Sequence, residues 1–173
     1  MSKMLLKKHL QSQSKEQIIE QILDLYNNYK PVKEYYTFYL NPDEQGMFEK
    51  YKAIIVNEFY PKTKSFNPKT RFSVAKKAIA DFSKLKPSPE LIGDLMVTFV
   101  ENACQFTFDF GDMWEQYYNS TSTNFNQTLK FLHKNKLLDR FKIRMEKCIK
   151  YAKPCGYGFA DEICDLYVEY YEE

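Results

Sequence analysis

Apolar residues recur at intervals of three and four along almost the whole chain, and strict alternation of apolar and polar residues is rare. This period places the apolar side chains on one face of an α-helix. The sequence therefore predicts an all-α protein, with a short basic helix near the N-terminus. Further helices are expected at about residues 15–29, 32–39, 42–60, 72–85, 89–110, 114–134, 138–152 and 159–170.

Two helix starts carry local signals. Ser14-Lys15-Glu16-Gln17 has the form of a capping box, in which Ser14 and Gln17 each bind a backbone N–H of the other. Asn41-Pro42-Asp43-Glu44 supplies a cap residue, a first-turn proline and two acidic residues in order. Poor helix formers in the stretch NSTSTN, residues 119–124, weaken the prediction of the helix at 114–134.

The helix at 89–110 is apolar well beyond one face and is expected to be central. Short connections favour antiparallel neighbours, so we expect stacked antiparallel αα-hairpins in a helical bundle or a short curved array. A chain of 173 residues is on the scale of one domain. We therefore expect a single helical domain over 1–173, in which the N-terminal helices of 1–40 pack on the hairpin array of 42–172.

Composition narrows the functional classes. A net charge of +2 gives the whole molecule no strong attraction to nucleic acid or to anionic membranes. No stretch approaches 18 uncharged apolar residues, so we expect no membrane association and a cytoplasmic location. In that setting the four cysteines, Cys104, Cys148, Cys155 and Cys164, are expected to be reduced thiols.

Reactive centres have no local signature. The cysteine intervals match no zinc spacing, neither histidine follows a glutamate by three residues, and the five glycines are scattered. We therefore expect no metal, no cofactor and no catalytic residue, and an enzymatic role is not favoured. A packing role for the thiols and for His133 is the simpler interpretation.

A narrow polar stripe follows the central helix between apolar neighbours. If it faces the interior of a curved array, its carboxylates and amides would meet aromatic side chains in a cleft. The more ordinary alternative is a stripe that faces water. The residues of this candidate binding surface are Asp94, Thr98, Glu101, Asn102 and Gln105.

The segment PKTKSFNPKTRFSVAKK, residues 61–77, is basic and contains no acidic residue. It could bind nucleic acid or another polyanion if its cations shared one surface with an exposed Phe66 or Phe72. It could also be a solvated connection, or face the acidic last helix within one molecule or across a dimer. The candidate polyanion-binding residues are Lys62, Lys64, Lys69, Arg71, Lys76 and Lys77.

Three segments carry a resemblance to a known family: SKEQIIEQILDLYNNYKPVKEYYTFYLNP (14–42), RFSVAKKAIADF (71–82) and GYGFADEICDLYVEYYEE (156–173). Together they resemble a bacterial family known only as a domain of unknown function. The resemblance implies a small all-helical cytoplasmic protein. It implies no activity, cofactor or catalytic residue.

The sequence thus leaves three functional hypotheses. The first is a non-enzymatic helical module, monomeric or homodimeric, that binds a protein or peptide partner. The second is nucleic-acid or polyanion binding through residues 61–77. The third is an uncharacterised enzyme with a site near Glu101.

Overall fold

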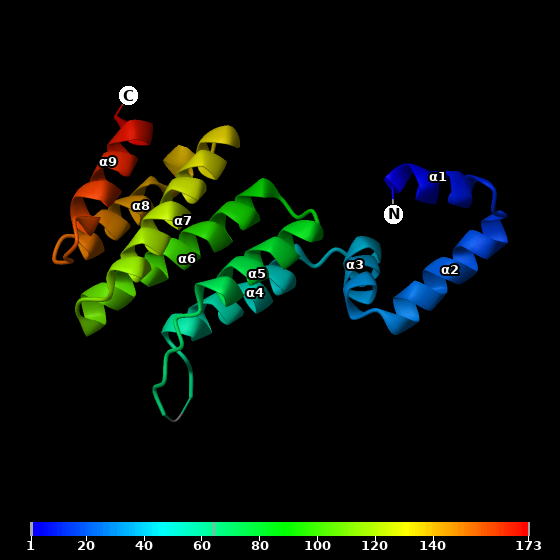
Figure 1. Cartoon of the computed structure of the whole chain (residues 1–173), viewed down its shortest axis with the longest axis horizontal. Coiled ribbons are helices and arrows are strands. Elements are labelled where there is room, and N and C mark those ends of the chain that lie inside the picture. The colour runs from blue at the N-terminus through cyan, green and yellow to red at the C-terminus, as the bar shows by residue number, and fades with distance from the viewer. Residues whose placement is uncertain (1, 64, 173) are drawn as a thin grey trace. The chain divides into compact units, whose positions relative to one another are not determined.

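The computed structural model describes residues 2–63 and 65–172, and within them the protein is all-helical (Figure 1). The predicted all-α class is therefore confirmed. The helices are α1 (Lys3–Gln11), α2 (Lys15–Asn28), α3 (Lys30–Leu40), α4 (Glu44–Phe59), α5 (Phe72–Lys84), α6 (Pro89–Phe110), α7 (Glu115–Lys134), α8 (Leu138–Ala152) and α9 (Phe159–Tyr171).

The helix boundaries follow the local signals closely. At the start of α2, the Ser14 hydroxyl accepts from the Gln17 N–H at 3.2 Å, and the Gln17 side chain accepts from the Ser14 N–H at 2.9 Å. The predicted capping box is confirmed. Pro31 lies in the first turn of α3, whereas α4 begins only at Glu44, two residues later than the proline at position 42 suggested.

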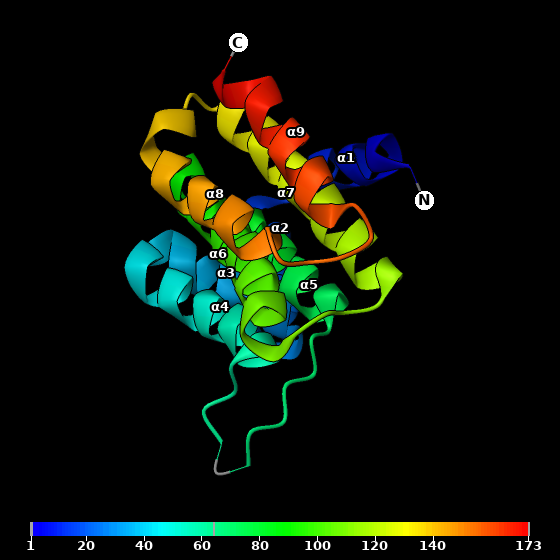
Figure 2. The same ribbon diagram turned by 90° about the vertical axis from the view of Figure 1, so that its left-hand side faces the viewer.

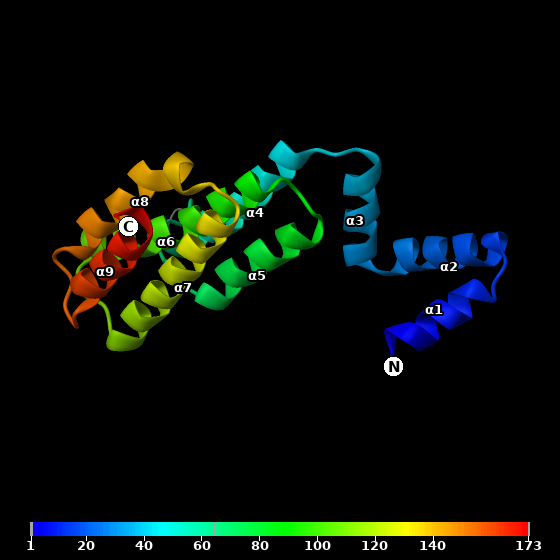
Figure 3. The same cartoon turned by 90° about the horizontal axis from the view of Figure 1, so that it is seen from above.

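The chain divides into two compact units, residues 1–43 and 44–173, and each is described by itself. In the first unit α2 packs on α3, and the chain turns between them at Tyr29 (Figure 3), whose backbone is extended. Phe38 is the one buried side chain that α1, α2 and α3 provide among the described residues. The expected packing of residues 1–40 on the rest of the chain stays a prediction.

The second unit is organised around α6, which packs against α4, α5, α7 and α8 (Figure 2). Its side chains are buried on most sides, as the sequence predicted for a central helix. Aromatic rings fill the contact with α4 and α5. The Phe59 ring is fully buried, and its centroid lies 6.1 Å from those of Phe99 and Phe106 and 5.9 Å from that of Phe72.

The polar stretch at 119–124 does not interrupt α7. Polar side chains here donate to carbonyl oxygens one turn earlier, Thr121 to Tyr117 at 2.9 Å and Asn124 to Ser120 at 2.6 Å. Thr128 makes the same kind of bond to Asn124, at 2.8 Å. Because these bonds satisfy the side chains of Thr121, Asn124 and Thr128, poor helix formers can be buried in the middle of a continuous helix, although the buried Ser122 hydroxyl has no hydrogen-bond partner among the described residues.

Candidate functional site

One arginine of α8 lies across the predicted polar stripe of α6. Its Nε donates to Glu101 Oε2 at 2.7 Å, its Nη1 to Asp94 Oδ1 at 2.5 Å and its Nη2 to Thr98 Oγ1 at 3.0 Å. This arginine is Arg144, and its side chain is only 26% exposed. Three of the five predicted stripe residues are therefore brought together by a single guanidinium group.

Two further ion pairs extend this contact along both helices. Arg140 pairs with Glu90, and Lys147 Nζ lies 4.0 Å from Glu101 Oε1. The cations Arg140, Arg144 and Lys147 are spaced by four and three residues, and the acidic residues Glu90, Asp94 and Glu101 by four and seven. Both spacings keep the charges on one face of a helix, and these opposite charges were a signal in the sequence that could have paired the two helices.

Asn102 and Gln105 are engaged within α6 itself. The Asn102 amide donates to the Thr98 carbonyl oxygen at 2.7 Å, and the Gln105 amide donates to Asp109 at 3.3 Å. They do not join the Arg144 cluster. The acidic residues of the stripe are already bound to α8. The role of the stripe as a binding surface stays a prediction.

The basic segment is fixed just before the start of α5 by Glu58 of α4. The Arg71 N–H and Nε each donate to Glu58 Oε2 at 3.0 Å, and Arg71 Nη2 donates to Oε1 at 2.7 Å. The Glu58 backbone oxygen accepts from the N–H groups of Lys69 and Thr70 at 3.0 and 2.8 Å. The side-chain hydrogen bond from Arg71 lowers the pKa of the buried Glu58 carboxyl below its ordinary value.

The predicted polyanion-binding cations therefore fall into different groups. Arg71 is committed to Glu58, and Lys77 pairs with Asp81. Lys64 lies outside the described residues. Of the six candidate residues, Lys62, Lys69 and Lys76 are exposed and make no ion pair within the described part of the chain.

Of the two phenylalanines that were candidates for stacking, only Phe66 is open. Phe66 is 50% exposed, with its ring centroid 5.1 Å from that of Phe110. Phe72 instead packs inward, with its ring centroid 5.1 Å from that of Phe99 and 4.9 Å from that of Tyr117.

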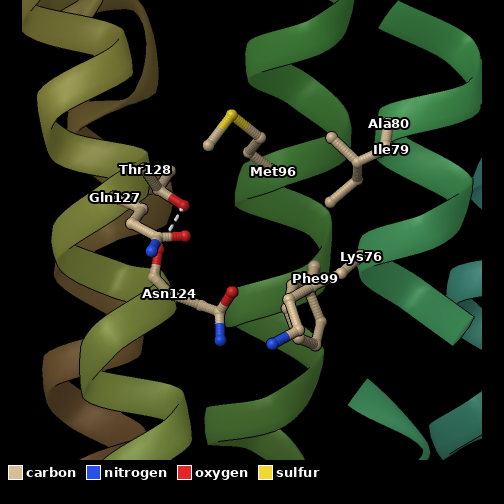
Figure 4. A pocket seen from close by; sticks show the side chains of 8 residues that line it. All are labelled: Lys76, Ile79, Ala80, Met96, Phe99, Asn124, Gln127 and Thr128. Carbon is tan, nitrogen blue, oxygen red and sulfur yellow. Dashed lines mark hydrogen bonds between the residues drawn. The ribbon is translucent and has the colours of Figure 1, made fainter. Parts of the chain in front are cut away.

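A cleft that the sequence did not indicate lies on the side of α6 opposite the polar stripe. It has a volume of about 200 Å³, and Figure 4 shows side chains from α5, α6 and α7 around it. Met96 and Phe99 of α6 form its floor, and Met96 is two positions, or about 200° around the helix, from Asp94. The walls are Lys76, Ile79 and Ala80 on α5 and Asn124, Gln127 and Thr128 on α7.

The cleft combines apolar and polar surface. Ile79, Ala80 and Met96 offer apolar contact, while the α7 wall offers hydroxyl and amide groups. The Asn124 and Thr128 side chains already donate to α7 carbonyls, so the Gln127 amide is the freest hydrogen-bonding group of that wall. Lys76 supplies the charge of the cleft lining.

The fold and these contacts define an all-helical protein whose central helix carries an ion-pair network on one face and a cleft on the other. The family model described as "Family of unknown function (DUF6155)" matches residues 1–154, and the chain belongs to this family. The resemblance seen in the sequence is thus confirmed, although the segment 156–173 lies outside the matched range. Comparison with curated proteins and with solved structures finds no match.

Within residues 2–63 and 65–172, no helix is long and apolar enough to cross a membrane. The same residues contain no group of three or more His, Cys, Asp or Glu side chains arranged to hold a metal ion. Cys104, Cys148, Cys155 and Cys164 are free thiols.

Replacing Arg144 should destabilise the second unit. Arg144→Met keeps an apolar stem but leaves Asp94 and Glu101 partly buried without their donor, so we expect the free energy of unfolding to fall by about 2 kcal/mol. Lys147→Met is the control, because Lys147 is half exposed and lies farther from Glu101, and it should cost less than about 0.5 kcal/mol. Chemical denaturation measures both, and equal losses would contradict the assigned role of Arg144.

The Glu58 contact should make stability depend on pH. Because the pKa of Glu58 is lowered in the folded state, its stabilisation is fully present above the ordinary value of 4.5 and is lost as the pH falls through the lowered value. Glu58→Gln should therefore reduce the free energy of unfolding by about 1 kcal/mol at pH 7. The difference from the parent chain should shrink toward pH 3, whereas the exposed-site control Glu169→Gln should show little difference at either pH. A Glu58→Gln deficit that stays constant with pH would refute this account.

Proposed function

We propose that the protein is a non-enzymatic interaction module that binds an amphipathic helical segment of a partner protein in the cleft between α5 and α7. The observation that carries this proposal is the incomplete packing around α6. In Figure 2, α4, α6 and α8 lie in one row and α5, α7 and α9 in another. Within the second row α7 packs on α9, but α5 does not pack closely on α7, and the cleft lies at this gap.

The helix contacts support a stacked arrangement for the second unit. Each consecutive pair packs together, α4 with α5, α6 with α7 and α8 with α9. Successive pairs are joined through α4–α6 and α6–α8 contacts. We infer a short array of antiparallel helix pairs in which α5 and α7 meet at Phe72 and Tyr117 and leave a groove for an added helix beyond that contact.

The lining chemistry favours a helical ligand with one apolar face. Met96, Phe99 and Ile79 can pack against aliphatic side chains spaced by three and four residues, and Met adapts to varied shapes. Gln127 can bind a polar group at the edge, and Lys76 favours an acidic residue at one end of the ligand. None of the eight lining side chains is an Asp, Glu, His or Cys, which fits binding rather than proton transfer or nucleophilic attack.

A peptide library tests this proposal with a defined probe. Random peptides displayed on phage and selected against the full chain should converge on apolar residues at helical spacing with an acidic residue near one end. A selected synthetic peptide should lose at least tenfold in affinity for Ala80→Trp, which fills the groove from its exposed rim. The control Ile143→Trp, at a highly exposed position of α8, should bind as the parent chain does. Undiminished binding to Ala80→Trp would exclude this cleft as the site.

Nucleic-acid binding through the basic segment is a second candidate function. The observation that favours it is the half-exposed Phe66 ring in the same segment as Lys62 and Lys69, two lysines without an ion pair within the described residues. An exposed ring among cations can stack on an unpaired base. Lys76 lies on α5, downstream of the loop, and could extend the contact.

Gel-shift binding to a single-stranded oligonucleotide tests this second candidate. Complex formation at low salt should weaken as salt is added, and the triple change of Lys62, Lys69 and Lys76 to alanine should remove it. Arg71 is left unchanged because it holds Glu58. Changing Lys134, Lys150 and Lys153 to alanine removes the same charge elsewhere and should preserve binding. An oligonucleotide that shifts neither protein at low salt would eliminate this candidate.

A further inference from the structure

The N-terminal unit exposes apolar side chains on two helices that have no buried residue of their own. Its described part, residues 2–43, is smaller than most chains that fold on a core of their own without staples. A unit of this kind needs a surface to cover its apolar groups. The exposed side chains of α1 and α2 are Met4, Leu5, Leu6, Ile19, Leu23 and Leu25, with exposures of 43–65%.

The two helices carry opposite charge. In α1 the cations are Lys3, Lys7 and Lys8, and there is no acidic residue. In α2 the residues Glu16, Glu20 and Asp24 recur every fourth position and therefore form one flank, beside the exposed Ile19 and Leu23. No ion pair joins α1 to α2 within the described part of the chain, so both flanks remain available.

We propose that these helices form a homodimer contact in which α1 of each chain lies on α2 of the other. In a twofold interface every contact occurs twice. A chain with one basic and one acidic helix, each with exposed apolar side chains, is therefore complementary to its own copy. Each α1 then covers Ile19 and Leu23 of its partner while its lysines meet the acidic flank. The contact uses other residues than the α6 cleft and does not depend on the function proposed for that cleft.

A second copy fits these features better than a membrane surface does. The acidic flank of α2 would be repelled by anionic lipid, and α1 has only nine residues with which to enter the interface. A second copy satisfies both the charges and the apolar groups with residues that are present on the chain itself.

Charge exchange gives a test that is independent of the exact register. One full-length variant carries Lys3, Lys7 and Lys8 changed to Glu, and a second carries Glu16, Glu20 and Asp24 changed to Lys. Sedimentation equilibrium of the parent chain should detect a dimer, whereas each variant alone should show at least a tenfold higher dissociation constant because its helices carry like charges. An equimolar mixture of the two variants should form a heterodimer, since each basic helix again meets an acidic one.

Apolar substitutions complete the test. Leu6→Glu and Leu23→Glu should each weaken the dimer at least tenfold, while Ile143→Glu, at an exposed apolar position of α8, should leave it unchanged. Circular dichroism checks that helix content is retained. A parent chain that stays monomeric at 100 µM overturns the proposal, whether or not it binds phosphatidylserine vesicles. So does a variant mixture that fails to associate, or a dimer that is insensitive to Leu6→Glu and Leu23→Glu.

Discussion

The burial of α6 on almost all sides is the constraint on which the second unit depends. A helix of 22 residues that is apolar beyond one face cannot be covered by a single neighbour, and α4, α5, α7 and α8 each take part of its surface. Where α6 is apolar, aromatic rings around Phe59 and Phe99 fill the contact. Where α6 is polar, the guanidinium of Arg144 spans Asp94 and Glu101, so the same helix is held by two different kinds of interaction.

The two faces of α6 have different consequences for function. The ion-pair face is occupied by α8, and its charged groups already have partners. The opposite face is covered by α5 and α7, which leave Met96 and Phe99 at the bottom of a cleft because they do not pack closely on each other. A partner helix bound in the cleft would pack against α7, as α9 already does.

Much of the fold was predictable because its determinants are local. Helical periodicity and the Ser14–Gln17 capping box fixed the helix positions closely, since a helix needs few distant contacts to be recognised. The polar stripe was also visible, but its partner Arg144 lies 43 residues beyond Glu101 and depends on how α8 packs. The cleft was not predictable, because Met96 and Phe99 have the pattern of ordinary packing residues, and the gap above them arises from the positions of two other helices.

The same distinction applies to the basic segment. Its charge was evident in the sequence, yet two of the predicted cations, Arg71 and Lys77, are paired with Glu58 and Asp81. Buried Glu58 sits within an apolar stripe of α4, so its role could be recognised only once the chain beyond the loop returned to it.

Amide hydrogen exchange along the chain tests the central role of α6 most directly. If α6 is the element that α4, α5, α7 and α8 share, its middle amides should exchange only through global unfolding, with a protection free energy equal to that from chemical denaturation. Amides of α5 and α9 should exchange through smaller openings. Faster exchange in the middle of α6 than in α5 or α9 would contradict this account.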